Sequence, residues 1–187
     1  MLGWYHRLPP RVRGWVPYVV GAGLTMVLVG ILGVAVGAKS PEATSMAVRG
    51  AGTPAPDVGV VDLFVHNAGI AVRSALGILS FGVYTTWVLL VNGFMVGAIL
   101  ADAAEQNGLT WALLGLFPHG VVELPAFWLA GAVGYRWLNF AWKLANGDRD
   151  RIAGPWLALE SLAVVGLSLA LLFVAAVIEA TVTVQLV

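Results

Sequence analysis

Eight polar or ionisable side chains lie in stretches of the sequence that are otherwise apolar, and their chemistry needs an explanation. A charged group at the centre of a membrane-spanning helix costs roughly 2.5–3.5 kcal/mol on insertion scales. Such a group therefore faces the interior of a helix bundle, where it finds partners, or it is neutral. The eight residues are His66, Asn67, Arg73, Asn92, His119, Glu123, Glu160 and Glu179.

The stretch LFPHGVVELP holds His119 and Glu123, which are four residues apart and share one face of a helix. This pair supports three interpretations: a hydrogen-bonded structural pair, half of a metal site, or an acid/base pair that relays protons. The spacing is not the H-E-x-x-H of metalloproteases. No serine or cysteine nucleophile lies in a recognisable frame either, so the sequence does not favour an enzyme.

A metal site would need ligands from other helices. Histidine and glutamate both bind zinc or a similar divalent ion, which is the cofactor that this chemistry would suit. The predicted metal ligands are His66, His119, Glu123 and Glu179. The predicted buried polar cluster comprises Asn67, Asn92, His119, Glu123 and Glu179.

The composition identifies the class of protein that must position these residues. Of 187 residues, 59% are hydrophobic and 11% charged, against about 25% charged in soluble domains. Apolar runs of roughly 20 residues recur, which is the length of a membrane-spanning helix. The alternation of apolar and polar residues that marks the strands of an outer-membrane barrel does not appear. We therefore predict an all-α, polytopic transmembrane bundle in contact with the lipid bilayer. The net charge of zero excludes nucleic acid as a partner.

Hydropathy and loop composition predict about five spans. Pro118 and Pro125 predict that the fourth is kinked or broken. A turn near Tyr84–Thr86 would separate the second and third spans. The predicted segments are an interfacial N-terminus (1–17), a first span (18–38), an external loop (39–59) and a helical membrane domain (60–182) with spans at about 61–83, 86–104, 111–134 and 156–182.

The distribution of basic residues predicts the orientation. Cytoplasmic loops carry an excess of lysine and arginine. Basic residues gather before the first span and again between the fourth and fifth spans, at Arg136–Arg151. Five spans put both groups inside, which predicts a multi-pass protein of the cytoplasmic membrane with its N-terminus inside and its C-terminus outside. The first apolar stretch is longer than the core of a signal peptide, so we expect it to be retained.

Glycines recur at spacings that allow helix backbones to approach closely. Tight packing within the chain is the favoured interpretation, and a homo-oligomer through glycine-rich helix faces is the alternative. The glycines concerned are Gly30, Gly33, Gly37, Gly77, Gly82, Gly93 and Gly97.

Four stretches, in order, resemble the stage II sporulation protein M family: HNAGIAVRSALGILSFGVY, VNGFMVGAIL, FPHGVVELPAFWLAGAVG and AAVIEATVT. The resemblance covers roughly residues 60–182. The positions that match the family's motifs are Asn67, Asn92, Gly93, Pro118, His119, Gly120, Glu123 and Glu179.

The resemblance implies an integral membrane protein of about five spans. In endospore formers, the family member helps to localise two peptidoglycan-degrading partners. Two hypotheses follow for this chain. It is a non-catalytic envelope scaffold that anchors other envelope proteins, or it binds a metal, lipid or solute through its buried polar cluster as a transporter subunit or metal-dependent membrane enzyme.

Overall fold

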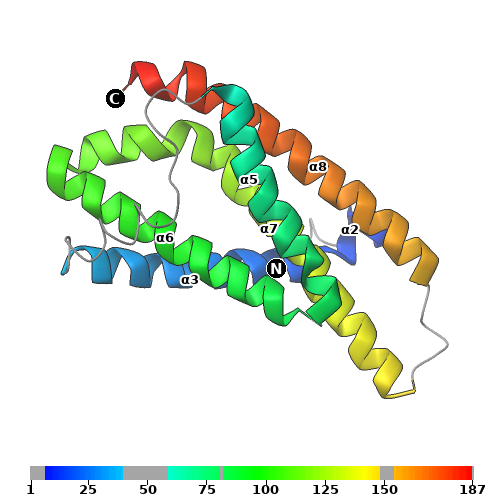
Figure 1. Cartoon of the computed structure of the whole chain (residues 1–187). Coiled ribbons are helices and arrows are strands. Elements are labelled where there is room, and N and C mark those ends of the chain that lie inside the picture. Colours follow the sequence, from blue (N-terminus) through cyan, green and yellow to red (C-terminus); the bar gives the residue numbers. More distant parts are fainter. Residues whose placement is uncertain (1–6, 40–58, 81, 148–153, 187) are drawn as a thin grey trace.

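The computed structural model describes residues 7–39, 59–80, 82–147 and 154–186, and within them every regular element is helical (Figure 1). Five long helices form the bundle, as the sequence predicts. The elements are α2 (Pro10–Arg13), α3 (Val16–Gly37), α5 (Val60–Ala75), η1 (Leu76–Ser80), α6 (Val83–Asn107), α7 (Leu109–Ala145), α8 (Gly154–Thr181) and η3 (Thr183–Gln185). The predicted external loop lies almost wholly outside the described residues, as does most of the segment before α8.

Four of these helices are long and apolar enough to cross a membrane: Pro10–Gly37, Val83–Asn107, Leu109–Ala145 and Pro155–Gln185. The predicted second span corresponds to α5, which is not among the four. This helix has 16 residues and carries Asp62 near its start and Arg73 near its end. It is therefore shorter than the roughly 20 residues that a regular membrane-spanning helix needs.

Helices α3 and α6 run side by side in the same direction, and glycines make their contact close (Figure 1). A Cβ added at Gly97 would meet the backbone carbonyl of Gly30, and one added at Gly33 would meet that of Phe94. Farther along both helices, a Cβ at Gly37 would lie 2.9 Å from that of Ala101. Since no side chain fits in these places, the small residues permit backbone-to-backbone packing within one chain. The glycine-rich faces of α3 and α6 therefore pack against each other within one chain.

Helix α7 is continuous but bent, and it forms the centre of the bundle. It contains both Pro118 and Pro125, and it changes direction along its length (Figure 1). The predicted kink in the fourth span is confirmed, whereas a break is not seen. Just after the second proline, the buried Ser168 of α8 donates a 2.8 Å hydrogen bond to the carbonyl of Ala126. The buried core around this point combines the alanines Ala22, Ala71, Ala126 and Ala130 with the larger Met26, Leu89, Phe127 and Leu172.

Two tight turns differ from the sequence prediction. The chain turns at Gly82, whose φ of 80° suits glycine, so α6 begins at Val83 and Tyr84–Thr86 lies in its first turn instead of forming the turn between helices. Only Gly108, with a φ of 89°, separates α6 from α7. The polar stretch DAAEQN, which resembles a loop in sequence, instead completes α6, because a single glycine is enough to reverse the chain.

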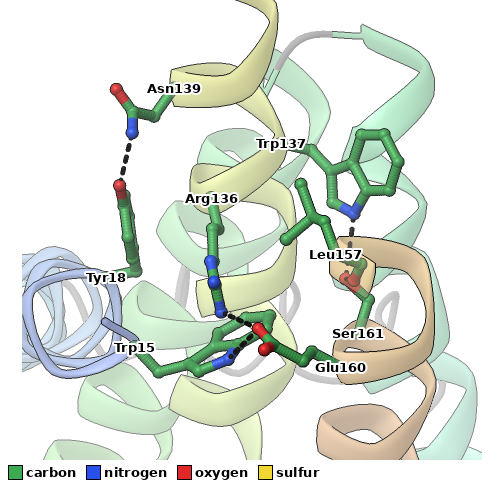
Figure 2. A network of polar contacts seen from close by, with 8 residues as sticks. All are labelled: Trp15, Tyr18, Arg136, Trp137, Asn139, Leu157, Glu160 and Ser161. Carbon is green, nitrogen blue, oxygen red and sulfur yellow. Dashed lines mark hydrogen bonds and ion pairs between the residues drawn. The ribbon is translucent and has the colours of Figure 1, made fainter. Parts of the chain in front are cut away.

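One end of the bundle is tied together by polar side chains from three helices (Figure 2). Arg136 of α7 lies with Nη1 2.8 Å from Oε2 of Glu160 on α8, although its N–H does not point along that line. Trp15, which precedes α3, donates a 3.3 Å hydrogen bond to the same carboxylate oxygen and packs its ring 4.1 Å from the Arg136 guanidinium. We call these three residues the arginine cluster. Glu160, one of the eight polar residues in apolar stretches of the sequence, has a partner here.

Candidate functional site

At the opposite end of α7 and α8, three of the predicted ligands come together. His119 and Glu123 lie one turn apart on α7, with Nε2 and Oε2 3.8 Å from each other. Glu179 approaches them from the last turns of α8, and one ligand atom from each of the three residues lies within 4.8 Å of the others. His119 is buried, and the two glutamates are partly buried. The i, i+4 spacing predicts the contact between His119 and Glu123. Glu179 joins them only because α7 and α8 pack antiparallel.

Thr183 orients the histidine, and the sequence prediction missed it. Its Oγ1 lies 3.2 Å from Nδ1 of His119, and both side chains are buried. When Nδ1 carries the proton and donates it to Thr183, Nε2 keeps a lone pair directed toward Glu123. A ligand histidine is commonly held by such a hydrogen bond at its other ring nitrogen. Thr183 follows α8 in the sequence VTVQLV, where nothing distinguishes it from an ordinary residue at a helix end.

The three residues form part of the wall of a cleft of about 850 Å³. The cleft is partly open and lies between α5, α6 and α7, with the end of α8 closing one part of it. Its remaining polar lining includes His66, Asn67, Arg73 and Asn92. Seven of the eight polar residues therefore share one cavity, although they do not all touch one another, and the eighth, Glu160, belongs to the arginine cluster.

His66 and Asn92 lie apart from the three-residue group. His66, on α5, lines the cleft but does not belong to the group of ligand atoms within 4.8 Å that the described residues form. Asn92 donates a 2.7 Å hydrogen bond to the Val88 carbonyl of its own helix. A proline has no N–H to donate to the carbonyl one turn before it, so Pro118 and Pro125 leave two carbonyls of α7 without their helical partner. The hydrogen bond of Asn92 goes to α6 and not to either of these carbonyls. The candidate metal-ligand set in the structure is His119, Glu123 and Glu179.

The geometry of this set suits a small divalent cation. In a tetrahedral zinc site, with bonds of about 2.0–2.2 Å, the ligand atoms are roughly 3.3–3.6 Å apart. The 3.8 Å separation of His119 and Glu123 is close to this value, and side-chain rotations would bring Glu179 within it. One imidazole and two carboxylates can bind zinc, manganese or ferrous iron. Three protein ligands would leave at least one coordination position free.

Comparison with known proteins agrees with the family resemblance. The family model described as stage II sporulation protein M matches residues 19–184. The chain is similar to the "Uncharacterized protein MJ0706" of Methanocaldococcus jannaschii, with 26% identity over 106 residues. That alignment covers 54% of this chain and 47% of the relative, so the chain matches about half the length of this relative. No solved structure matches the chain. From the family match over most of its length, we conclude that this multi-pass membrane protein belongs to the stage II sporulation protein M family.

Proposed function

We propose that this protein binds a divalent metal ion within the membrane, using His119, Glu123 and Glu179. One observation carries the proposal: ligand atoms of these three residues, from two helices, lie within 4.8 Å of one another at the wall of a cleft. The imidazole of His119 supplies nitrogen and the two carboxylates supply oxygen, the donor set that transition-metal ions accept.

A purely structural role explains this arrangement less well. A helix pair held together by hydrogen bonds needs one donor for each acceptor, whereas this group sets two carboxylates beside a single imidazole. Partly buried carboxylates that lie side by side repel each other and lose hydration. A divalent cation would neutralise both of them at once. A hydrogen bond donated by Nδ1–H of His119 to Oγ1 of Thr183 would hold the imidazole in the tautomer whose Nε2 can bind a metal.

The test is the metal content of the protein purified without chelator and exchanged into metal-free buffer. We expect close to one equivalent of zinc, manganese or iron per chain in the wild type. His119→Ala should lose it, because one of three ligands is removed. The matched control is His66→Ala, which removes the other histidine of the cleft without touching the group, and it should keep the metal. A wild type that holds no metal, even after incubation with each of the three ions, would refute the proposal.

Family membership supports a second proposal, that the chain anchors other envelope proteins. The resemblance to the family member that helps to localise two peptidoglycan-degrading enzymes is its basis. Covalent crosslinking in living cells, followed by purification under denaturing conditions, should recover defined envelope proteins. Crosslinking that recovers none in the native host would count against an anchoring role.

We also propose that the end of the bundle that holds the arginine cluster faces the cytoplasm. The described basic residues of this end are Arg7, Arg11, Arg13, Arg73, Arg136 and Lys143, whereas the opposite end carries Lys39 together with Asp62, Asp102 and Glu105. This asymmetry follows the positive-inside rule.

Because α3 and α6 run parallel, the chain between them must return across the bundle. At about 1.5 Å per α-helical and 2.0 Å per 3₁₀ residue, α5 and η1 together extend about 34 Å, which is enough to cross the hydrocarbon layer.

Reporter fusions test this orientation. A reporter inserted after Asn146 is expected to be active inside, and one fused after Val187 outside. With the N-terminus also inside, a reporter inside at Asn146 requires that α5 and η1 act as a further crossing beside α3, α6 and α7. The proposal is wrong if the Asn146 reporter is found outside, or if both reporters are found on the same side, because α8 would then not cross the membrane.

A further inference from the structure

We propose that the cleft binds a membrane phospholipid, with its phosphate at Arg73 and an acyl chain along the apolar wall between α5, α6 and α7. This site lies in the same cleft as the proposed metal site but uses different residues, so either one can exist without the other. It would place a lipid beside the group formed by His119, Glu123 and Glu179.

Arg73 supplies the first argument, because the described residues include no anionic partner for this cation. The residue lies in the last turn of α5 and lines the cleft. Within the described part of the chain, no ion pair joins it to another residue, whereas Arg136 is paired with Glu160. An arginine in a membrane helix needs a counter-ion or access to the lipid headgroups. A guanidinium is well suited to bind a phosphate, because its donors match two of the phosphate oxygens.

The residues around Arg73 place it at headgroup depth. Tyr84 and Trp87, from the start of α6, line the same end of the cleft and are 40% and 63% exposed. Tyrosine and tryptophan concentrate where hydrocarbon meets headgroups, because their rings are amphipathic. Arg73 also lies at the same end of the bundle as Arg136 and Lys143. A phosphate bound there would belong to the leaflet that this basic end faces.

The wall beyond Arg73 is suited to a hydrocarbon chain. Much of its lining is apolar and includes Leu63, Ile70, Val91, Met95, Val96 and Ile99, beside the polar His66, Asn67 and Asn92. The volume of about 850 Å³ lies in the range of sites that enclose most of a small organic ligand, roughly 300–1,000 Å³. Val91 and Ile99 are 39% and 38% exposed, so the cleft is accessible from the side, as entry of a lipid from the bilayer would require. A free phosphate ion would use Arg73 but would leave this wall without a ligand.

Native mass spectrometry of the protein in detergent with added phosphatidylglycerol tests the proposal. The wild type should retain one phosphatidylglycerol per chain after detergent exchange. Arg73→Gln should lower this retention about tenfold, because a charge-assisted hydrogen bond to the phosphate is lost. Val91→Trp should lower it to a similar extent by filling the path of the acyl chain.

Two control variants separate specific binding from general effects on charge or bulk. Lys143→Gln removes a cation from the same end of the bundle, and Val65→Trp adds the same ring to an exposed position on α5. Neither residue lines the cleft, and both variants should retain the lipid as the wild type does. Equal retention in all four variants would overturn the proposal. So would release of the lipid by inorganic phosphate at the same concentration, because the acyl chain would then contribute nothing.

The same measurement distinguishes this proposal from the metal proposal. Retention of phosphatidylglycerol should be unchanged in His119→Ala and in the presence of a chelator, since Arg73 and the apolar wall bind the lipid. If retention requires the metal, the site as described here is wrong even if the metal site is correct.

Discussion

Glu179→Gln is expected to lower the affinity of the protein for its divalent ion by at least about 100-fold. Loss of an outer hydrogen bond to a metal ligand already costs about 10–100-fold, and the loss of a direct ligand exceeds this. Titration of the metal-free protein with zinc would measure the change. The same substitution should leave the thermal stability of the metal-free protein unchanged or raise it, because it removes one of two neighbouring carboxylates.

The prediction is specific because Glu179→Gln should weaken metal binding without destabilising the metal-free protein. At a free metal concentration 100 times the dissociation constant, binding stabilises the folded protein by about 2.7 kcal/mol. The wild type should show this stabilisation and Glu179→Gln should not. Thr183→Val should give an intermediate loss of affinity, because it frees Nδ1 of His119 without removing a ligand. Glu105→Gln, on the exposed end of α6, is the matched control. Should Glu179→Gln destabilise the metal-free protein, the carboxylate would be acting as a structural partner and not as a ligand.

Much of the fold could be predicted from the sequence, because membrane helices leave a strong signal in hydropathy. The long helices α3, α6, α7 and α8 follow from apolar runs, and the bend in α7 follows from two prolines. The helix bounds were less predictable. The stretch YRWLNFAWKLA is basic and aromatic like an interfacial loop, yet it continues α7 to Ala145. Its Trp137 finds a partner in Ser161 of α8, at 3.0 Å, which explains why the helix persists there.

The second predicted span shows why hydropathy alone is insufficient. Residues 60–101 form one long apolar region, whose length indicates two spans but not where they meet. Helix α5 ends at Ala75 and α6 begins at Val83. This break brings Thr85 of α6 against the backbone of Ser74, Gly77 and Gly134. Its hydroxyl donates a 2.7 Å hydrogen bond to the Ser74 carbonyl, in space left by Gly77 and Gly134. Such a fit depends on Gly134 of α7, which is distant in sequence from the other two segments.

The candidate site was predictable in part for a similar reason. The i, i+4 relation of His119 and Glu123 is a property of a single helix and can be seen in the sequence. The approach of Glu179 and Thr183 depends on the antiparallel register of α7 and α8. That register is held at the other end of the same two helices by the arginine cluster. Contacts at one end of the bundle therefore help to determine the geometry at the other.

Arg136→Met is expected to destabilise the folded protein by about 3 kcal/mol, the lower end of the range for breaking a buried ion pair. Both side chains of the pair are 21% exposed, so the full effect of deep burial does not apply. The substitution removes the arginine partner of Glu160, which keeps the indole N–H of Trp15, and it removes the guanidinium from the Trp15 ring. Unfolding in detergent micelles, followed by circular dichroism, would measure the change.

A double-mutant cycle shows whether the loss comes from the pair. Adding Glu160→Gln to Arg136→Met should recover part of the stability, since the carboxylate left without its cation is then removed. Arg11→Met is the matched control, because Arg11 is exposed, lies 5.2 Å from the Trp156 ring and forms no ion pair with another described residue. It should cost less than about 1 kcal/mol. If the two substitutions in the cycle are simply additive, Arg136 and Glu160 are independent. The register of α7 and α8, on which the site at their other end depends, must then be maintained by apolar packing and the serine hydrogen bonds alone.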